Sequence, residues 1–470
     1  MISLLHPLVK PSAGWDPGIF ALKTTERGLG MSRRRRSKRG VSLGTVVMLL
    51  LTIVVLGGFC ALLPRLTGVT DVRTNAAELA VAIDQSLSQI AASGVSLVGP
   101  TPQASVLPPS SLATATPTAA APTTPPEQRF TLCAAGSIQI NSNVQKALTD
   151  DGTYRFDILF GDLEGDLTAD LSIATLENNV IGSAKLSDSN IPADVLVPLR
   201  ETGVNALCLG YYGALNGGIS GLVETQQAVS AAGMTPYGVY ASQQQRDSLT
   251  LMDVNGISVA LLSFQNELTS SGKRQTSDEE QAFAIASQQL PVITEEIAKA
   301  RQAGAKVVVV SLCWGKEGAT APTSTQTELA QGIADAGADI ILGTHSGTLQ
   351  TVEILTAERG DGKYHPVLCA YSLGNLFTYD REQRSTLASI LLRSDVVYDP
   401  VTGCVAFDNL TYTPTYSWRG KEDDITRYRV ILNDGQTYPD YVDDTQRGVM
   451  ERCLTLVTDV MEGTPVSPAQ

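Results

Sequence analysis

A histidine stands where a short apolar segment of this sequence ends. His345 follows the run IILGT at residues 340–344, and the chain has only two other histidines, His6 and His365. The apolar run is long enough for a buried strand and too short for a helix. Ligands of open α/β sheets bind outside the carboxyl ends of strands, so this position favours catalysis or binding. A histidine that only hydrogen-bonds within a loop is the other interpretation.

Four acidic residues lie close together further upstream, Asp162, Glu164, Asp166 and Asp170. A calcium loop needs a glycine and a bidentate glutamate at fixed positions, and this spacing lacks them. We therefore expect a solvated face near a helix rather than a calcium site.

The charges are divided unevenly along the chain. Residues 1–65 contain ten Lys or Arg and two Asp or Glu, whereas the other 405 residues contain 24 and 46. Because phosphate binding needs a cationic surface, the acidic part is a poor candidate for nucleic-acid binding. The seven cysteines are scattered without a CxxC pair, and several lie inside apolar runs, which indicates buried thiols rather than a disulfide framework.

The N-terminal quarter divides by composition into four segments. Residues 1–40 form a basic tail, although translation could also begin at Met31, directly before the arginine cluster. Residues 41–63 are uncharged and long enough to span a membrane. Residues 64–98 include an amphipathic pattern typical of a stalk helix, and residues 99–128 form a linker rich in Pro, Thr and Ala.

The basic cluster before the apolar segment predicts the orientation in the membrane. Positive charge favours the cytoplasmic side, so the N-terminus is expected in the cytoplasm and the main domain outside the cell. A cleaved signal peptide is the competing interpretation. We favour an uncleaved single-pass anchor, because the segment is long and no clear cleavage site follows it.

The remaining chain, residues 129–463, alternates between strand and helix patterns. Buried strands are expected near residues 170–176, 204–209, 306–313 and 340–342, and helices over 221–232, 279–303, 325–336 and 446–461. The Asn255-Gly256 pair predicts a hairpin between strands 249–254 and 257–264. Alternating helices and strands with hairpins indicate a layered α/β sandwich with mixed sheets.

Six short motifs follow one another between about residues 130 and 380. They are AGS at 135–137, ATLE at 174–177, GYYGALN at 210–216, CWGKE at 313–317, GTHSG at 343–347 and YSLGN at 371–375. In this order they resemble the CapA family, capsule-synthesis proteins linked to bacterial poly-γ-glutamate and related to calcineurin-like metallophosphoesterases. The resemblance implies a sandwich of that metallophosphoesterase type and a role in surface-polymer assembly.

The motifs depart from the family pattern where metal ligands are expected. A two-metal hydrolytic centre needs imidazoles and carboxylates around ions ~3.5–4 Å apart. The positions of the family's ligands carry other residues here: Ser137, Tyr211, Tyr212, Gly213, Asn216, Cys313, Thr344 and Gly347. Glu177, Glu317, His345 and Asn375 remain.

Two interpretations of this remnant are open. Glu177, Glu317 and His345 could hold one zinc or manganese ion, with Cys313 as an added thiolate and with His345 and Glu177 in catalytic roles. In the other, the metal is lost and residues such as Asn375 only brace loops. We favour the second, because several ligand positions changed together to residues that ligate poorly.

The same loops define an expected binding pocket. It comprises Ser137, Tyr211, Tyr212, Asn216, Cys313, Trp314, Glu317 and Asn375. The aromatic residues could stack on a sugar or a peptidoglycan fragment, or they could fill the space left by metals and histidines, which we favour.

The sequence therefore predicts a membrane-anchored, extracytoplasmic CapA-like protein without catalytic activity and without a required cofactor. It would act in the assembly, export or anchoring of a capsule, poly-γ-glutamate or another surface polymer. Expected partners are the membrane, the polymer, and polymer-synthesis membrane proteins, with self-association through the stalk helix. The alternative is a single-metal phosphoesterase-like hydrolase or transferase that acts on envelope polymers.

Overall fold

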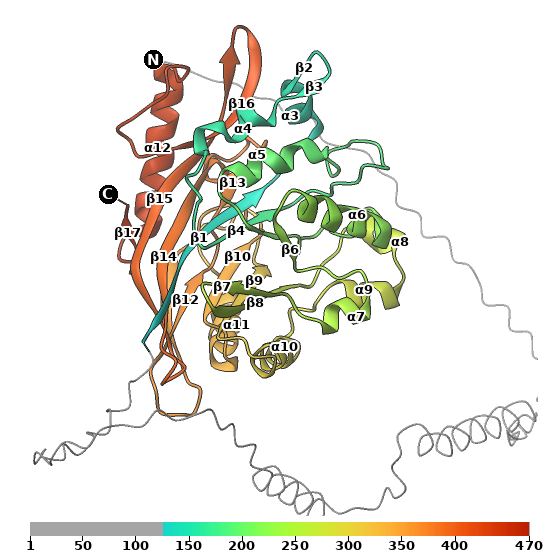
Figure 1. Cartoon of the computed structure of the whole chain (residues 1–470). Helices are drawn as coiled ribbons and strands as arrows, with labels where there is room; N and C mark the ends of the chain where they lie inside the picture. Colours follow the sequence, from blue (N-terminus) through green and yellow to red (C-terminus); the bar gives the residue numbers. More distant parts are fainter. Residues whose placement is uncertain (1–125, 470) are drawn as a thin grey trace, which may run out of the picture. The chain divides into compact units, whose positions relative to one another are not determined.

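A computed structural model describes residues 126–469, which all belong to one compact unit, Pro117–Gln470 (Figure 1). The expected tail, membrane segment 41–63, stalk and nearly all of the linker lie outside the described residues. Among the residues from 126 to 469, no helix is both long and apolar enough to cross a membrane.

Two sheets dominate the described unit. The larger has nine strands in the order β16-β15-β14-β1-β4-β5-β6, with β13 beside β1 and β17 beside β15. Its strands are β1 (Gln128–Ile138), β4 (Leu171–Leu176), β5 (Ala206–Cys208), β6 (Thr235–Tyr237), β13 (Asn375–Phe377), β14 (Ala388–Tyr398), β15 (Val405–Glu422), β16 (Ile425–Leu432) and β17 (Ser467–Pro468). The unit thus extends a few residues beyond the expected limit of 463.

The smaller sheet has six strands in the order β11-β12-β10-β9-β8-β7. They are β7 (Leu251–Val254), β8 (Ile257–Gln265), β9 (Val307–Cys313), β10 (Ile340–Thr344), β11 (Val352–Ala357) and β12 (His365–Ala370). Strands β8, β9, β10 and β12 are parallel, and β7 and β11 add antiparallel edges. Both sheets are therefore mixed, as the sequence predicts.

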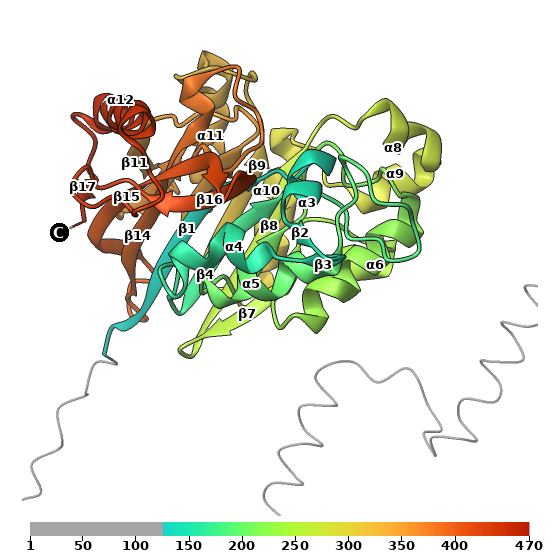
Figure 2. The same cartoon turned by 90° about the horizontal axis from the view of Figure 1, so that it is seen from above.

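Side-chain alternation along the strands packs the two sheets against each other. In β9, Val307 and Val309 lie in a core shared with Leu132 and Ile173 of the large sheet. Val308 and Val310 face a second core under helices. Because successive side chains of a strand point to opposite faces, this pattern gives four layers, helix, sheet, sheet and helix (Figures 1 and 2). The expectation of a layered α/β sandwich is confirmed.

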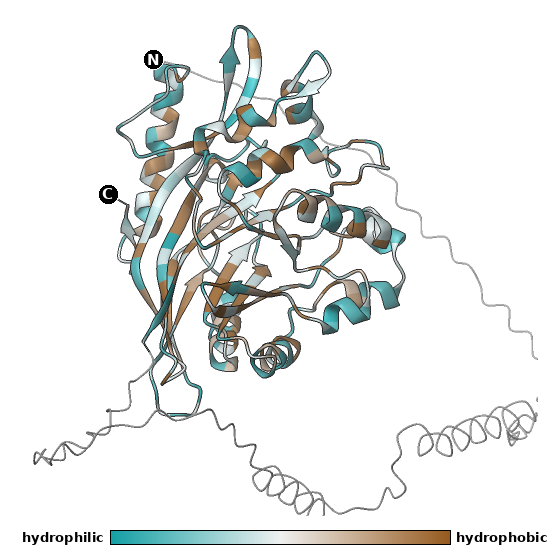
Figure 3. Cartoon of the chain, viewed as in Figure 1, coloured by the Kyte–Doolittle hydropathy of each residue, from teal (hydrophilic) through white to brown (hydrophobic). Residues whose placement is uncertain are grey.

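The helices cover the outer faces of the sheets. The large sheet is covered by α3 (Ser142–Ala147), α4 (Phe156–Phe160), α5 (Leu196–Glu201) and α6 (Gly218–Ala231), and the small sheet by α10 (Leu290–Gln302) and α11 (Ser324–Ala336). Three short helices follow α6 and precede α10 in the chain: α7 (Gln243–Asp247), α8 (Ser270–Gln275) and α9 (Asp278–Ala284). Figure 3 shows apolar residues in the strands and in the longer helices, whereas α7, α8 and α9 are mostly hydrophilic.

The prediction of a single helix over residues 279–303 is wrong. The segment forms α9 and α10, which are separated by an extended stretch that contains Ile285. Two causes are visible. The backbone N–H of Gln265 donates to the carbonyl of Ala286 at 3.0 Å, which holds the extended stretch against β8. In addition, Pro291 suits only the first turn of a helix, so α10 begins there.

Several other sequence predictions are confirmed. Asn255 and Gly256 both have positive φ, at 55° and 80°, as a tight hairpin turn requires. Helix α11 ends at Gly337 in the left-handed conformation and leads into β10. The terminal helix α12 (Asp444–Met461) packs its apolar face on β14 and β15, on the side away from α6 (Figure 1).

The acidic cluster is divided between different partners. Asp162 accepts hydrogen bonds from Arg429 at 3.0 Å and Tyr441 at 2.8 Å, so it is not simply solvated. Asp170 accepts from the amide and hydroxyl of Thr131, and Glu164 is exposed. The six described cysteines are free and five of them are buried, as expected.

Candidate functional site

Strands of both sheets end at one edge of the unit, and the sequence-predicted residues follow them. Ser137 is in the last two residues of β1, Glu177 follows β4, and Cys313 ends β9. His345 follows β10, and Asn375 starts β13, opposite Ser137. The carboxyl ends of parallel strands are the usual ligand-binding edge of such sheets.

His345 takes an unusual backbone conformation at this edge. Its φ is 86°, in a region that L-residues rarely adopt. Its ring lies 4.3 Å from the ring of Tyr212, measured between centroids, at an angle of 40°. Because strained residues often mark functional sites, this position supports the selection of His345, and Tyr212 is the partner that holds its ring.

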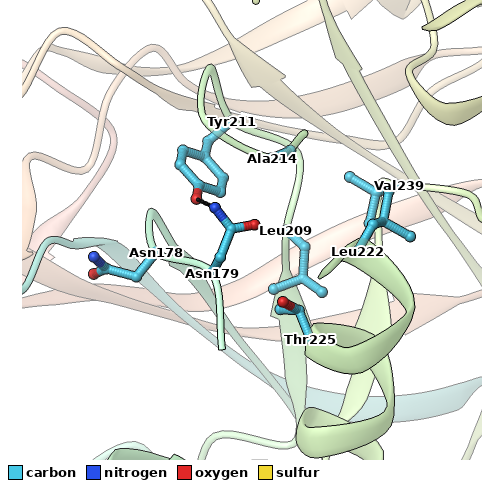
Figure 4. A pocket seen from close by; sticks show the side chains of 8 residues that line it. All are labelled: Asn178, Asn179, Leu209, Tyr211, Ala214, Leu222, Thr225 and Val239. Carbon is cyan, nitrogen blue, oxygen red and sulfur yellow. Dashed lines mark hydrogen bonds between the residues drawn. The ribbon is translucent and has the colours of Figure 1, made fainter. Parts of the chain in front are cut away.

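Tyr211 fills space instead of facing a ligand. Its side chain is only 7% exposed, and its hydroxyl accepts a hydrogen bond from Asn179 at 3.0 Å (Figure 4). A Cβ added at Gly213 would lie 2.7 Å from the Tyr211 ring. The tyrosine thus occupies the space into which a longer residue at 213 would extend. The cavity beneath it has a volume of ≈ 10 Å³, about the size of one water.

Trp314 is a second filling residue. It is 4% exposed, stacks on Tyr371 at 5.9 Å between ring centroids, and donates its indole N–H to the Tyr371 carbonyl at 2.8 Å. A Cβ added at Gly343 would lie 2.3 Å from the Trp314 Nε1. Its ring is therefore fixed against the strands and is not available to stack on a sugar.

Polar residues brace the neighbouring loops. Asn216 accepts from the hydroxyl of Thr269, and the amide of Ser137 donates to the Gly374 carbonyl at 3.1 Å. The Asn375 amide nitrogen donates to the carbonyls of Gly347 and Thr386, at 3.0 and 3.3 Å. These contacts fit the bracing role proposed for Asn375.

Only one of the two carboxylate oxygens of Glu177 has a hydrogen-bond partner in the protein. Its backbone N–H donates to Ile138, and its Oε2 accepts from Gln139 Nε2 at 2.7 Å. Its Oε1 is buried and has no hydrogen-bond partner. Glu317, by contrast, is exposed to solvent.

Burial and carboxylates make the site acidic and proton-retaining. Burial, followed by the charges of Cys313, Glu267 and Glu317, raises the pKa of Tyr212 to about 12. Burial and then Glu177 raise the pKa of the Cys313 thiol well above its ordinary value.

The retained residues do not form a metal-ligand set. From residue 126 to residue 469, no three His, Cys, Asp or Glu side chains are grouped closely enough to hold an ion. Glu177, Glu317 and His345 share the edge but are not brought together as a triad. One carboxylate oxygen of Glu177 is also committed to Gln139. The donor set therefore does not fit the two-ion centre that the resemblance implies, or a single ion held by those three residues.

Sequence reasoning missed three polar residues at this edge. Gln265 ends β8, opposite Cys313 in the adjacent strand, and is 2% exposed. Gln139 directly follows β1, and Glu267 lies in the loop after β8. A signal was available, because Gln139 and Glu267 follow the carboxyl ends of buried strands and Gln265 is the last residue of one. None of them lies in a family motif.

An open hollow of ≈ 380 Å³ adjoins the site through Asn179 and Asn216. Most of its walls carry hydroxyl, amide or charged groups, including Ser183, Asn190 and Glu224. It could accommodate a polar chain next to the strand ends.

A sequence profile described as "Bacterial capsule synthesis protein PGA_cap" matches residues 131–380, which are 250 of the 470 residues. The chain belongs to this family. The match covers all six motifs identified in the sequence and the strand ends that carry the site. The family resemblance stated from the sequence is confirmed.

Two curated relatives are similar to the chain. The capsule biosynthesis protein CapA of Bacillus anthracis is 27% identical over 286 residues, covering 57% of this chain and 64% of its own length. The PGA biosynthesis protein CapA of Bacillus subtilis is 29% identical over 184 residues, covering 38% and 44%. The chain thus matches less than two thirds of the length of either relative.

Solved structures give weaker likenesses. A phosphatase from Mycoplasma pneumoniae is 12% identical with a TM-score of 0.35, covering 65% of this chain and 94% of that one. The calcineurin-like phosphoesterase YfkN from Bacillus subtilis is 12% identical with a TM-score of 0.33, covering 71% and 99%. Values this low carry no conclusion about chemistry.

Proposed function

We propose that this chain is a membrane-anchored, extracytoplasmic, non-catalytic protein of surface-polymer assembly, export or anchoring. The proposed polymer is poly-γ-glutamate or another capsule polymer. The family match over residues 131–380 carries this proposal, together with the names of the two CapA relatives. The fold that we propose for it is a sandwich of the metallophosphoesterase type.

The filled site supports the non-catalytic part of the proposal. Tyr211 and Trp314 are buried side chains with protein partners of their own. Metal-assisted phosphoester hydrolysis needs ions that polarise the substrate and activate water. The retained acidic and histidine side chains are not arranged to hold such ions.

The membrane anchor is proposed from the sequence alone. Residues 41–63 form an uncharged apolar segment of sufficient length, and six basic residues precede it between 33 and 39. This arrangement supports a cytoplasmic N-terminus and an external main domain.

Metal content of the purified full-length chain tests the non-catalytic part of the proposal. We expect less than about a tenth of an equivalent of zinc or manganese after purification without chelator, and no phosphatase turnover. One equivalent of either metal that disappears in His345→Ala would support the hydrolase or transferase instead. His365→Ala is the matched control, because His365 lies at the opposite end of β12 and pairs with Asp361.

Deletion of the gene in its native host tests the polymer role. We expect loss of the extracellular polymer, restored by the wild-type gene and also by His345→Ala. A host that retains all of its surface polymer after deletion would contradict the proposal. Failure of the histidine variant alone to restore polymer would contradict only the non-catalytic part.

A further inference from the structure

Three side chains at the candidate site carry buried polar atoms without a protein partner. They are Oε1 of Glu177, Oδ1 of Asn375, and both amide atoms of Gln265. Gln265 is 2% exposed and Asn375 3% exposed. A buried polar atom that lacks a hydrogen bond costs about 1–3 kcal/mol. Such atoms at one strand edge therefore indicate a ligand that completes their hydrogen bonds.

The three side chains come from strands that meet at this edge. Gln265 pairs with Cys313 in the β8–β9 register and shares its face with Ser263, which contacts Cys208 of the large sheet. On the large sheet, Asn375 pairs with Ser137, and Glu177 is bonded to the same strand at Ile138. Asn375 also donates to the carbonyl of Gly347, in the loop after β10, at 3.0 Å, so the strand ends of both sheets meet at this edge.

The unpaired atoms are mostly acceptors. The Asn375 amide nitrogen is committed to two carbonyls, so the unpaired atom on that side chain is its oxygen. With Glu177 Oε1 and the Gln265 oxygen, the protein presents three acceptors, whereas the Gln265 nitrogen is the single unpaired donor. A ligand that completes these hydrogen bonds supplies mainly N–H or O–H donors.

The acidic residues around the site also favour a ligand that donates hydrogen bonds, and they favour one with a positive charge. Glu177 carries one of the unpaired oxygens, Glu267 lies in the loop after β8, and Glu317 lies in the loop after β9. The backbone N–H of Thr269 donates to the carbonyl of Tyr212 at 3.2 Å, which ties the loop that carries Glu267 to Tyr212. Negative charge and a partly exposed tyrosine ring both favour a cation.

We propose that this site binds a primary ammonium group of an envelope component, with a neighbouring carbonyl or hydroxyl oxygen that accepts from Gln265. An ammonium carries three N–H donors and one positive charge. It thereby complements the three acceptors and the surrounding glutamates. This inference rests on the proposed binding function and adds the chemical class that the site recognises: an amine-bearing chain end, amino sugar or amino acid.

Matched pairs of small probes test the inference on the full-length chain in detergent. Calorimetric titration compares glycinamide with N-acetylglycinamide, and glucosamine with N-acetylglucosamine, with EDTA present. We expect the free amine of at least one pair to bind at least ten-fold more tightly than its acetylated partner. Equal binding within both pairs, or no binding in either, would overturn the inference.

Variants assign the binding to this site. Gln265→Leu and Glu267→Gln are each expected to weaken amine binding about ten-fold, whereas Glu279→Gln, which removes an exposed charge on α9, should leave it unchanged. Unaltered affinity in both site variants would refute the assignment. Binding of Mn²⁺ or Zn²⁺ alone, with no amine binding in EDTA, would assign the unpaired oxygens to a metal and overturn the inference. Polymer loss on gene deletion is a separate measurement, so the proposed function can stand when the amine inference fails.

Discussion

His345 and Tyr212 form a small unit in which a strained backbone holds an aromatic ring in place. The φ of 86° at His345 penalises any side chain with a Cβ, and the ring contact at 4.3 Å offsets part of that cost. An L-residue in the left-handed region costs about 1–2 kcal/mol. The conformation is therefore maintained by what the ring contacts and by the loop after β10.

Glycine should be tolerated better than alanine at position 345. Both substitutions remove the ring, but only alanine retains the Cβ penalty, so His345→Gly is expected to be about 1 kcal/mol more stable than His345→Ala. Urea denaturation of both variants measures the difference. As a control, the same pair of substitutions at Gln331 inside α11 should show the opposite order, because glycine costs more than alanine in a helix. Equal stability of the two variants at 345 would argue against strain.

Gln265→Leu should stabilise the ligand-free protein. The leucine has a similar size and removes two buried polar atoms without partners, so a gain of about 1–3 kcal/mol is expected. Gln350→Leu is the matched control. Gln350 is equally buried but donates to Ala319 and Ala321 and accepts from Gln326, so its loss should destabilise. Chemical denaturation that finds Gln265→Leu as destabilising as this control would contradict the interpretation of Gln265 as unpaired.

At the scale of elements, one buried carboxylate joins the central strands β9 and β10 to helix α10 and to the loop after β11. Asp339, directly before β10, is 1% exposed and accepts from Arg301 of α10 at 2.6 Å, from Arg359 at 3.2 Å, and from the amide of Val308 in β9 at 2.8 Å. It therefore fixes the amino end of the strand whose carboxyl end carries His345.

Asp339→Ala should be strongly destabilising. It leaves two arginines without their shared partner near the core, and breaking a buried pair from one side costs about 3–5 kcal/mol. Asp408→Ala is the control, because Asp408 pairs with Arg129 at 2.9 Å where both side chains are about half exposed. Exposed pairs contribute about 0–1 kcal/mol. Comparable losses in the two unfolding curves would refute a special role for Asp339.

The elements show where sequence reasoning succeeds and fails. β9, β10 and the Asn255-Gly256 hairpin were predictable, because an apolar run or a turn-forming pair specifies each of them locally. The break between α9 and α10 has one local signal, Pro291, which suits only the first turn of a helix. Its other cause, the hydrogen bond from the backbone N–H of Gln265 to Ala286, joins residues 21 positions apart. Tertiary pairing of this kind leaves no local pattern.

The candidate site was predictable to a similar extent. The edge and residues such as Glu177 and His345 followed from strand ends and the family motifs. The roles of Tyr211 and Trp314 as filling residues were favoured, but only their burial and hydrogen bonds decide them. Gln265 stands at a strand end, which was an available signal, but its importance lies in hydrogen bonds that it does not make, and the sequence does not show these.

At the scale of the whole molecule, buried tyrosines set the response to alkaline pH. Burial raises the pKa of Tyr212 and of Tyr240 to about 12, and it raises the pKa of Tyr237 and Tyr371 further. The folded protein thus keeps phenol protons that the unfolded chain loses near pH 10. This stability is fully present below pH 10 and is lost as pH rises through the folded pKa values.

The melting temperature should accordingly be level from pH 8 to about pH 9.5 and fall steeply between pH 10 and 12. Calorimetry, together with phenolate absorbance, measures the loss and the ionisation in parallel. Tyr240→Phe should make the fall less steep, whereas Tyr364→Phe, at a tyrosine that is 63% exposed, should not. Full ionisation of all tyrosines near pH 10 without unfolding would contradict this account.

The direction of β1 has a consequence for what the domain can meet. The strand starts at Gln128, where the chain enters the described unit, and its far end bears Ser137 at the site. Eleven residues at ~3.3 Å each separate the two ends by roughly 35 Å. The preceding residues therefore join the unit at the end of β1 opposite the site. A ligand can reach Ser137 and its neighbours without passing the point at which the chain enters the described unit.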